Sequence, residues 1–157
     1  MANKRVIGYM TGAVIAASVA IGAHFEGQRT AAYKDIGGVP TICYGHTSGV
    51  KMGDTATHAQ CRAWLQQEMA QANATVHRCI HVPMSIGQEA AFTDAVYNAG
   101  PKIVCDSTLN HFANAGNMVA ACKQLPRWVY AGGKVAPGLV KRRRTEMQIC
   151  LGQPVTP

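Results

Sequence analysis

The chain has 157 residues, of which 48% are hydrophobic and 15% are charged. This length accommodates one domain with a substantial core, and the composition excludes an intrinsically disordered chain. The formal net charge of +7 favours polyanionic partners. The sequence contains no zinc finger, RNA-binding strand motif or basic stretch interleaved with aromatic residues, so we expect no nucleic acid partner.

The first feature along the chain is an apolar stretch. Lys4 and Arg5 precede an uncharged segment, residues 6–23, whose length matches a single membrane helix or an export signal. The segment contains no Leu or Phe, and each of its Val and Ile residues favours insertion by only about 0.3 to 0.6 kcal/mol. We therefore predict a weakly inserting signal anchor over residues 1–24 and a periplasmic domain over residues 25–157.

A cleaved signal peptide is the alternative interpretation of this segment, since small residues at Ser18 and Ala20, or at Ile21 to Ala23, offer a cleavage site. Cleavage after Ala23 would leave Glu26, the first carboxylate of the chain, third from a frayed N-terminus. A catalytic group is not held in place at such a position. We therefore favour an uncleaved anchor.

The rest of the chain is predicted to be mainly helical. The sequence YKDIGGVPTICYG, residues 33–45, is typical of two short strands joined by a turn at Gly37 and Gly38. Helical spacing and capping residues predict helices over residues 59–76, 85–98, 108–115, 118–125 and 140–150, with a break at Pro137 and Gly138. We expect an α+β fold in which one small antiparallel sheet accompanies the helices.

The eight Asp and Glu residues contain the candidates for acid and base catalysis. Glu68, Glu89 and Asp94 lie on predicted amphipathic helices, where a solvated face is the simpler interpretation. Glu26 follows an apolar helix, and neighbouring apolar surface would keep its carboxylic acid protonated. Asp35 lies in a polar hairpin and is expected to stay ionised. Two carboxyls in such unlike surroundings are what glycoside cleavage requires.

The segment FEGQRTAAYKDIGGVPTICYGHT, residues 25–47, resembles the active-site segment of phage-type lysozymes. In that family a Glu is followed nine residues later by an Asp and six residues after that by a Thr, as Glu26, Asp35 and Thr41 are here. Later segments are similar too: AVYNAG at 95–100, STLNHFANAG at 107–116, RWVYAGGKVAPGLVKRR at 127–143 and EMQICL at 146–151. The resemblance covers nearly the whole chain.

This resemblance implies a lysozyme-like fold with the sheet near the active site, and an enzyme that cuts peptidoglycan. The reaction implied is hydrolysis, with inversion, of the β-1,4 bond between N-acetylmuramic acid and N-acetylglucosamine, by a monomer without metal or other cofactor. Glu26 is the implied acid, Asp35 the base that places water, and Thr41 a residue that helps hold this water. Residues expected to bind the substrate are Asn98, Thr108, Asn110 and Trp128.

The N-terminal segment resembles that of the signal-anchor-release endolysins, a subgroup whose first helix begins in the membrane and later leaves it. While residues 6–23 lie in the host inner membrane, Glu26 would be held at the periplasmic face and the enzyme would be inactive. Release into the soluble periplasm would then permit host cell lysis. Because no Cys precedes Cys43, thiol exchange within the anchor does not supply the trigger.

The six cysteines favour disulfides over a zinc site, because no Cys-x-x-Cys pair is repeated and the periplasm is oxidising. About fifteen pairings are possible. Joining cysteines that are successive in the chain gives the pairs Cys43–Cys61, Cys79–Cys105 and Cys122–Cys150. His77, Cys79 and His81 alternate in the manner of metal ligands, but such a short segment is more often a loop, so we predict no metal site.

Two non-enzymatic interpretations remain open at this stage. A cationic protein that binds the envelope or permeabilises the membrane would account for the charge and the apolar segment. A disulfide-rich binding module would account for the cysteines but leaves the spacing from Glu26 to Thr41 to chance. The basic run at residues 141–144 is equally compatible with contact to an anionic glycan or lipid and with a solvated helix face.

Overall fold

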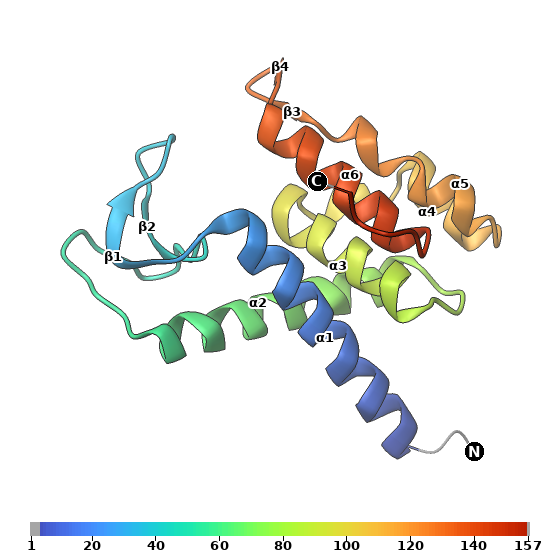
Figure 1. The fold of residues 1–157 in the computed structure, drawn as a ribbon, viewed down its shortest axis with the longest axis horizontal. Coiled ribbons are helices and arrows are strands. Elements are labelled where there is room, and N and C mark those ends of the chain that lie inside the picture. Colours follow the sequence, from blue (N-terminus) through green and yellow to red (C-terminus); the bar gives the residue numbers. More distant parts are fainter. Residues whose placement is uncertain (1–3, 157) are drawn as a thin grey trace.

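The computed structural model describes the backbone of residues 4–156 and the side chains of residues 12–156. Its centre is helix α3 (Ile86–Ala99), which packs against α1 (Lys4–Glu26), α2 (His58–Cys79) and α6 (Pro137–Cys150) (Figure 1). Residues 89–96 of α3 are all buried, as expected of a helix that is covered on every side. Together with the short C-terminal elements, these helices form the helical lobe.

A hairpin lies beside the helices and forms the other part of the molecule (Figure 1). Strands β1 (Arg29–Lys34) and β2 (Pro40–Cys43) pair in antiparallel fashion, with Tyr33 opposite Thr41. The loop that follows returns to β1 through an isolated bridge between Ala31 and Thr55. We call residues 29–57 the hairpin lobe. The predicted hairpin is confirmed.

The remaining elements are short and complete the helical lobe. They are η1 (Pro101–Ile103), α4 (Thr108–Asn114), α5 (Met118–Cys122), η2 (Leu125–Arg127), β3 (Tyr130–Ala131) and β4 (Lys134–Val135). The α+β class is confirmed, but the described chain contains two small sheets, because β3 and β4 form a second hairpin of two residues each. Pro137 was predicted to break a helix and instead begins α6, where its missing amide proton costs nothing.

Capping residues set the starts of the two predicted long helices of the helical lobe. The hydroxyl of Thr57 accepts a hydrogen bond from the Gln60 amide, and Ser85 does the same for Gln88. In both cases the Gln side chain returns a bond to the amide of the capping residue, which completes a capping box.

The second half of α1 is part of the folded core. Val14 and Ile21 pack with Ala90 of α3, and the buried Ser18 hydroxyl donates to the Val14 carbonyl at 2.8 Å. At Gly22 a Cβ atom would clash with the Sδ-bound methyl of Met69, so a larger residue at this position would require the Met69 side chain of α2 to move. Residues 14–22 are thus fitted to the helices beneath them.

The predicted anchor coincides with α1. Within the part of the chain whose side chains are described, no helix is long and apolar enough to cross a membrane. Residues 1–3 and the side chains of residues 4–11 of the predicted anchor lie outside the described part of the chain.

Three disulfides join the cysteines in the predicted successive pairs, Cys43–Cys61, Cys79–Cys105 and Cys122–Cys150. The HxCxH segment is consequently not a set of free ligands. Cys79 is oxidised, the Nε2 atom of His77 lies 2.6 Å from the Glu89 carboxylate, and His81 pairs with the Arg78 carbonyl.

The bond between Cys43 and Cys61 fastens strand β2 to the first turn of α2, and its loss is expected to destabilise the domain. The two cysteines are 18 residues apart. Loop-closure entropy for that separation predicts that Cys43→Ser with Cys61→Ser lowers the free energy of unfolding by about 3 kcal/mol. Urea unfolding followed by circular dichroism measures this change, and an unaltered midpoint would show that the hairpin lobe does not depend on the bond.

Candidate active site

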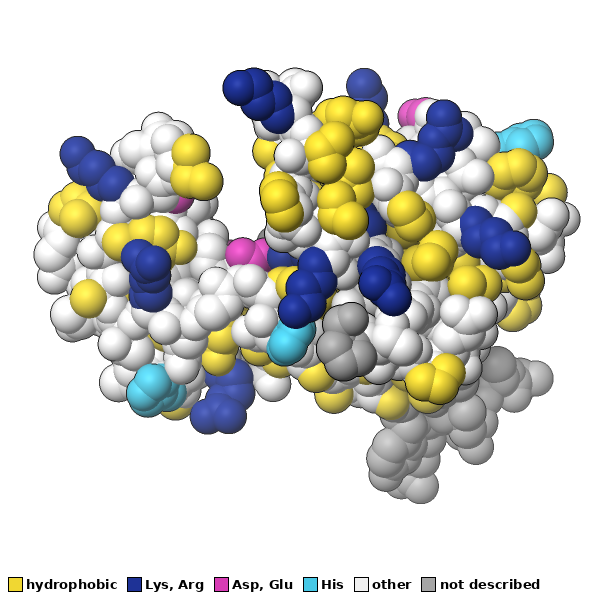
Figure 2. All heavy atoms as spheres, turned by 45° about the horizontal axis from the view of Figure 1, so that its top comes forward, with side chains coloured by type: hydrophobic (Ala, Val, Ile, Leu, Met, Phe, Trp, Pro, Cys, Tyr) yellow, Lys and Arg dark blue, Asp and Glu magenta, His cyan; other side chains and the backbone are white. Residues whose placement is uncertain are grey.

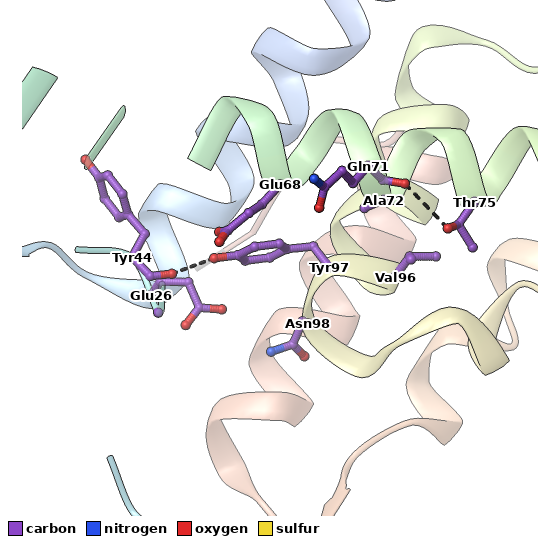
Figure 3. Close-up of a pocket in the computed structure, with 10 residues that line it drawn as sticks. Glu26, Tyr44, Glu68, Gln71, Ala72, Thr75, Val96, Tyr97 and Asn98 are labelled. Carbon is purple, nitrogen blue, oxygen red and sulfur yellow. Dashed lines mark hydrogen bonds between the residues drawn. The ribbon is translucent and has the colours of Figure 1, made fainter. Parts of the chain in front are cut away.

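Glu26 is the last residue of α1, and Gly27, with φ of +65°, ends the helix. The Glu26 side chain is 25% exposed and lines a cavity of about 490 Å³. Tyr44 from the hairpin lobe and Tyr97 from α3 line the same cavity (Figure 3). Figure 2 shows the hollow between the two lobes, with an acidic side chain at its floor.

The predicted apolar surroundings of Glu26 are wrong in one respect, because its carboxylate accepts a hydrogen bond from Nη1 of Arg142. The other face of this guanidinium donates to both carboxylate oxygens of Asp94, at 2.9 and 2.8 Å. Burial lowers the pKa of Arg142, but the bonds to Asp94 and Glu26 outweigh it and raise the pKa above its ordinary value. A permanently charged arginine therefore fixes the position of Glu26.

The interpretation of Asp94 and Glu89 as members of solvated helix faces is wrong, since their residues are 0% and 8% exposed. The basic run at 141–144 is likewise only half solvated: Lys141 and Arg144 are exposed, while the two arginines between them are buried. The sequence did carry a signal, because AAFTDAV, residues 90–96, surrounds Asp94 with apolar residues and leaves no polar face.

Tyr97 ties α3 to the hairpin lobe across the floor of the cavity. Its hydroxyl donates to the Tyr44 carbonyl at 2.5 Å (Figure 3). Burial, and next the charge of Glu68, raise the pKa of Tyr97 above its ordinary value. The phenol therefore stays a hydrogen-bond donor and holds the two sides of the cavity at a fixed separation. This role of Tyr97 was not predicted from the sequence.

Asp35 and Thr41 lie on the hairpin and do not line the cavity around Glu26. The Oδ1 atom of Asp35 accepts a bond from the Val39 amide at 2.8 Å, and the Thr41 hydroxyl donates to the Val39 carbonyl at 2.9 Å. The backbone amide and carbonyl of Val39 therefore orient both side chains. The structure brings the predicted base and its predicted helper together on one turn.

His46 of the hairpin lobe connects this lobe to α2. Its Nδ1 atom is 2.6 Å from the Glu68 carboxylate, and its ring stacks on Trp64 with 4.4 Å between the ring centroids. This pairing gives Glu68 a structural partner on the hairpin lobe.

The predicted substrate-binding residues are only partly brought together. Asn98 lines the Glu26 cavity and also an adjoining cavity of about 530 Å³ that contains Trp128. Trp128 also lines a third cavity of about 500 Å³, and Thr108 lines this third cavity too. Shared lining residues thus make the three cavities neighbours, from Glu26 to Thr108. Asn110 lines none of them, and its amide donates to the carbonyls of Cys79 and Val104 at 2.7 Å each.

A helical lobe and a small hairpin lobe that enclose a groove with a fixed glutamate at its floor define a lysozyme-like glycoside hydrolase. The model of the phage lysozyme family matches residues 23–146. The SAR-endolysin of Pseudomonas phage phiKMV is 39% identical over 146 residues, covering 90% of this chain and 91% of the relative. The chain belongs to the phage lysozyme family.

Solved structures agree with this assignment. The active form of the P1 phage endolysin Lyz superposes with a TM-score of 0.81 at 26% identity, covering 87% of this chain and 83% of that chain. The secreted inactive form of the same endolysin gives a TM-score of 0.54 at 25% identity, covering 67% and 75%. The protein is therefore a lysozyme, a muramidase that acts on peptidoglycan, and the two non-enzymatic interpretations are set aside.

Proposed function

We propose that this endolysin hydrolyses the β-1,4 bond between N-acetylmuramic acid and N-acetylglucosamine with inversion. Glu26 gives its proton to the glycosidic oxygen as the bond breaks. Asp35 accepts a proton from a water molecule, oriented with the help of the Thr41 hydroxyl, as the water attacks the anomeric carbon from the opposite face. The proton count balances, because Glu26 loses one proton and Asp35 gains one in each cycle.

The observation that carries this proposal is the placement of Glu26 at the floor of the cavity, held by Arg142 and still 25% exposed. An acid in that setting reaches a bound glycan without losing its orientation. The hairpin supplies the second carboxyl with one oxygen bonded to the Val39 amide. The unlike surroundings of the two carboxyls, one in an interlobe cavity and the other in an exposed turn, support the different roles proposed for Glu26 and Asp35.

Product analysis tests the reaction. Digestion of purified peptidoglycan is expected to release reducing ends that borohydride converts to muramicitol, and proton NMR is expected to show the α-anomer as the first product. Glucosaminitol instead of muramicitol would mean that a different glycosidic bond is cut. A β-anomer would mean that a covalent intermediate replaces the water held by Asp35 and Thr41.

We propose that the groove from Asn98 past Trp128 to Thr108 binds the glycan strand and its peptide stems. Trp128 is shared by two of the cavities and offers an indole face to a sugar ring. Trp128→Ala is expected to raise KM for peptidoglycan about tenfold with little change in kcat, because it removes binding that ground state and transition state share. The exposed Met52→Ala is the control, and equal KM values for both variants would contradict the assignment.

We propose further that the enzyme begins tethered at the periplasmic face of the host inner membrane through residues 6–23 and is released to act as a monomer. A helix in lipid cannot make the contacts that Val14, Ser18 and Ile21 make with α3 in the folded domain. Glu26 then cannot form its hydrogen bond with Arg142. The better superposition on the active than on the inactive form of P1 Lyz supports the interpretation of the docked α1 as the active state.

A further inference from the structure

Two successive arginines of α6 hold two different side chains of the Glu26 cavity. Arg142 donates to Glu26, the proposed acid. Arg143 is 0% exposed, and its Nη2 atom donates to the Oδ1 atom of Asn98 at 2.7 Å. Successive residues of a helix point in different directions, so one guanidinium reaches the end of α1 and the other reaches the last turn of α3.

The bond to Asn98 is the one well-directed hydrogen bond of the Arg143 side chain among the described residues. The Nε and Nη1 atoms of Arg143 lack acceptors, and the buried Glu146, 2.9 Å from Nη2, forms no hydrogen bond at either oxygen. A buried donor is costly to leave unpaired, so the guanidinium holds the acceptor that it has. The position of the Asn98 oxygen is therefore fixed.

This bond also decides the orientation of the Asn98 amide. A guanidinium has donors and no acceptor, so the atom that faces Arg143 must be the amide oxygen. The Nδ2 atom then points away from Arg143, and in Figure 3 it lies on the side of Glu26. Nδ2 donates to none of the described residues, so both of its N–H groups are available to a ligand.

Asn98 lies where two cavities meet. It lines the cavity of Glu26 and the adjoining cavity that contains Trp128. A sugar bound between Glu26 and Trp128 would therefore present its ring substituents to the Asn98 donors. Asn110 is the contrasting case, because its Nδ2 atom already donates to two backbone carbonyls and it lines neither cavity.

We propose that Asn98 donates from Nδ2 to the carbonyl oxygen of an acetamido group of the glycan, and that Arg143 is the positioning residue that keeps the amide in this orientation. An acetamido oxygen can only accept, so it requires the donor end of the amide. Sugar hydroxyls both donate and accept, and they do not distinguish the two ends. The inference rests on the proposed binding of the glycan beside Glu26 and Trp128.

The test compares intact glycan strands of peptidoglycan with the same strands after de-N-acetylation to amines. At mildly acidic pH the amine is a cation that only donates, so it meets the donors of Asn98 unfavourably. The wild type is expected to hydrolyse the acetylated strands with roughly 10- to 100-fold higher kcat/KM. Acetylating the amines again with acetic anhydride is expected to restore the rate.

Asn98→Asp separates the two ends of this side chain. Aspartate keeps an oxygen for Arg143 but replaces the amide donors with an acceptor. The variant is expected to lose about tenfold of the preference for acetylated strands, mainly through KM, because this binding is shared by ground state and transition state. Any change in rate that is common to the two substrates cancels in the ratio.

Asn117→Asp is the matched control. Asn117 is the exposed capping residue of α5, where its side-chain oxygen accepts from the Ala120 amide, and aspartate preserves this acceptor. The substitution adds the same negative charge and is expected to keep the wild-type preference. An equal preference in Asn98→Asp and Asn117→Asp would overturn the inference.

Arg143→Lys tests the positioning role. Lysine keeps the charge but has a single flexible ammonium in place of the rigid guanidinium, so the Asn98 amide is free to turn. A variant that folds by circular dichroism is expected to lose part of the preference for acetylated strands, whereas a merely structural role would lower the rates on both substrates alike. An unchanged preference would remove Arg143 from the proposal and overturn it.

Nuclear magnetic resonance of the wild type covers the case in which a variant fails to fold. Binding of the disaccharide of N-acetylglucosamine and N-acetylmuramic acid is expected to shift the side-chain amide signals of Asn98. The amide signals of Asn110 and the guanidinium signals of Arg143 are expected to stay in place. Unmoved Asn98 signals in the presence of bound disaccharide would overturn the inference.

This inference and the proposed function fail in different ways. No release of muramicitol ends from acetylated strands by the wild type would contradict the proposed function. Release of those ends together with the same preference in Asn98→Asp as in the wild type would contradict only the roles of Asn98 and Arg143.

Discussion

Glu26→Gln is expected to lower the rate of peptidoglycan hydrolysis by about 10²- to 10⁴-fold, because the amide keeps the shape of the side chain but has no proton to give the leaving oxygen. The amide oxygen can still accept from Arg142, so the position of α1 is preserved. The measurement is turbidity loss of outer-membrane-stripped Gram-negative cells, combined with release of reducing sugar from their walls.

Asp54→Asn provides the matched control for that experiment. Asp54 is exposed in the turn before α2, where one carboxylate oxygen accepts from the Lys51 amide at 2.8 Å. The same loss of one negative charge is expected to leave hydrolysis within about twofold of the wild type, since surface substitutions of this kind perturb little. Equal activity of Glu26→Gln and the wild type would show that the carboxyl which cleaves the glycan lies elsewhere.

The local features of the fold could be predicted from the sequence. Gly37 and Gly38 between β-branched residues gave the hairpin, and helical spacing gave α2 and α3 to within three residues at each end. The two-residue strands β3 and β4 could not be predicted, because a pair so short has no periodicity to detect. The prediction of Glu26, Asp35 and Thr41 as site residues came from an ordered family pattern, since their spacing alone is common.

The environment of Glu26 could not be predicted from the sequence, for a physical reason. Arg142 is 116 residues from Glu26 and 48 from Asp94 in the chain, and no local pattern links such positions. The burial of Glu146 has the same origin, because it depends on α6 lying across α3. A sequence periodicity shows which helix face is apolar, but the pairing of charges inside the core is set by tertiary contacts.

Helix α1 has two sets of positions with different requirements. Val14, Ser18 and Ile21 face the helical lobe and are buried, while alanines occupy exposed positions of the same turns. In lipid both sets face hydrocarbon, but in the docked helix only the first set makes contacts. In the proposed tethered enzyme, substitutions at the exposed positions therefore change the stability of the membrane-inserted state with little effect on the docked state.

Replacing three exposed alanines of α1 with leucine, Ala13→Leu, Ala16→Leu and Ala20→Leu, is expected to retain the protein in the membrane. Each leucine favours insertion by about 0.5 kcal/mol, and a total of about 1.5 kcal/mol shifts release roughly tenfold. Membrane fractionation and the time of lysis in cells measure this shift, and the purified, docked variant should keep wild-type hydrolysis.

Glutamine at the same three positions is the control and should speed release. Unchanged lysis by the leucine variant would mean that escape of α1 from the membrane does not limit the enzyme, whereas loss of hydrolysis in the purified variant would mean that these positions also affect docking.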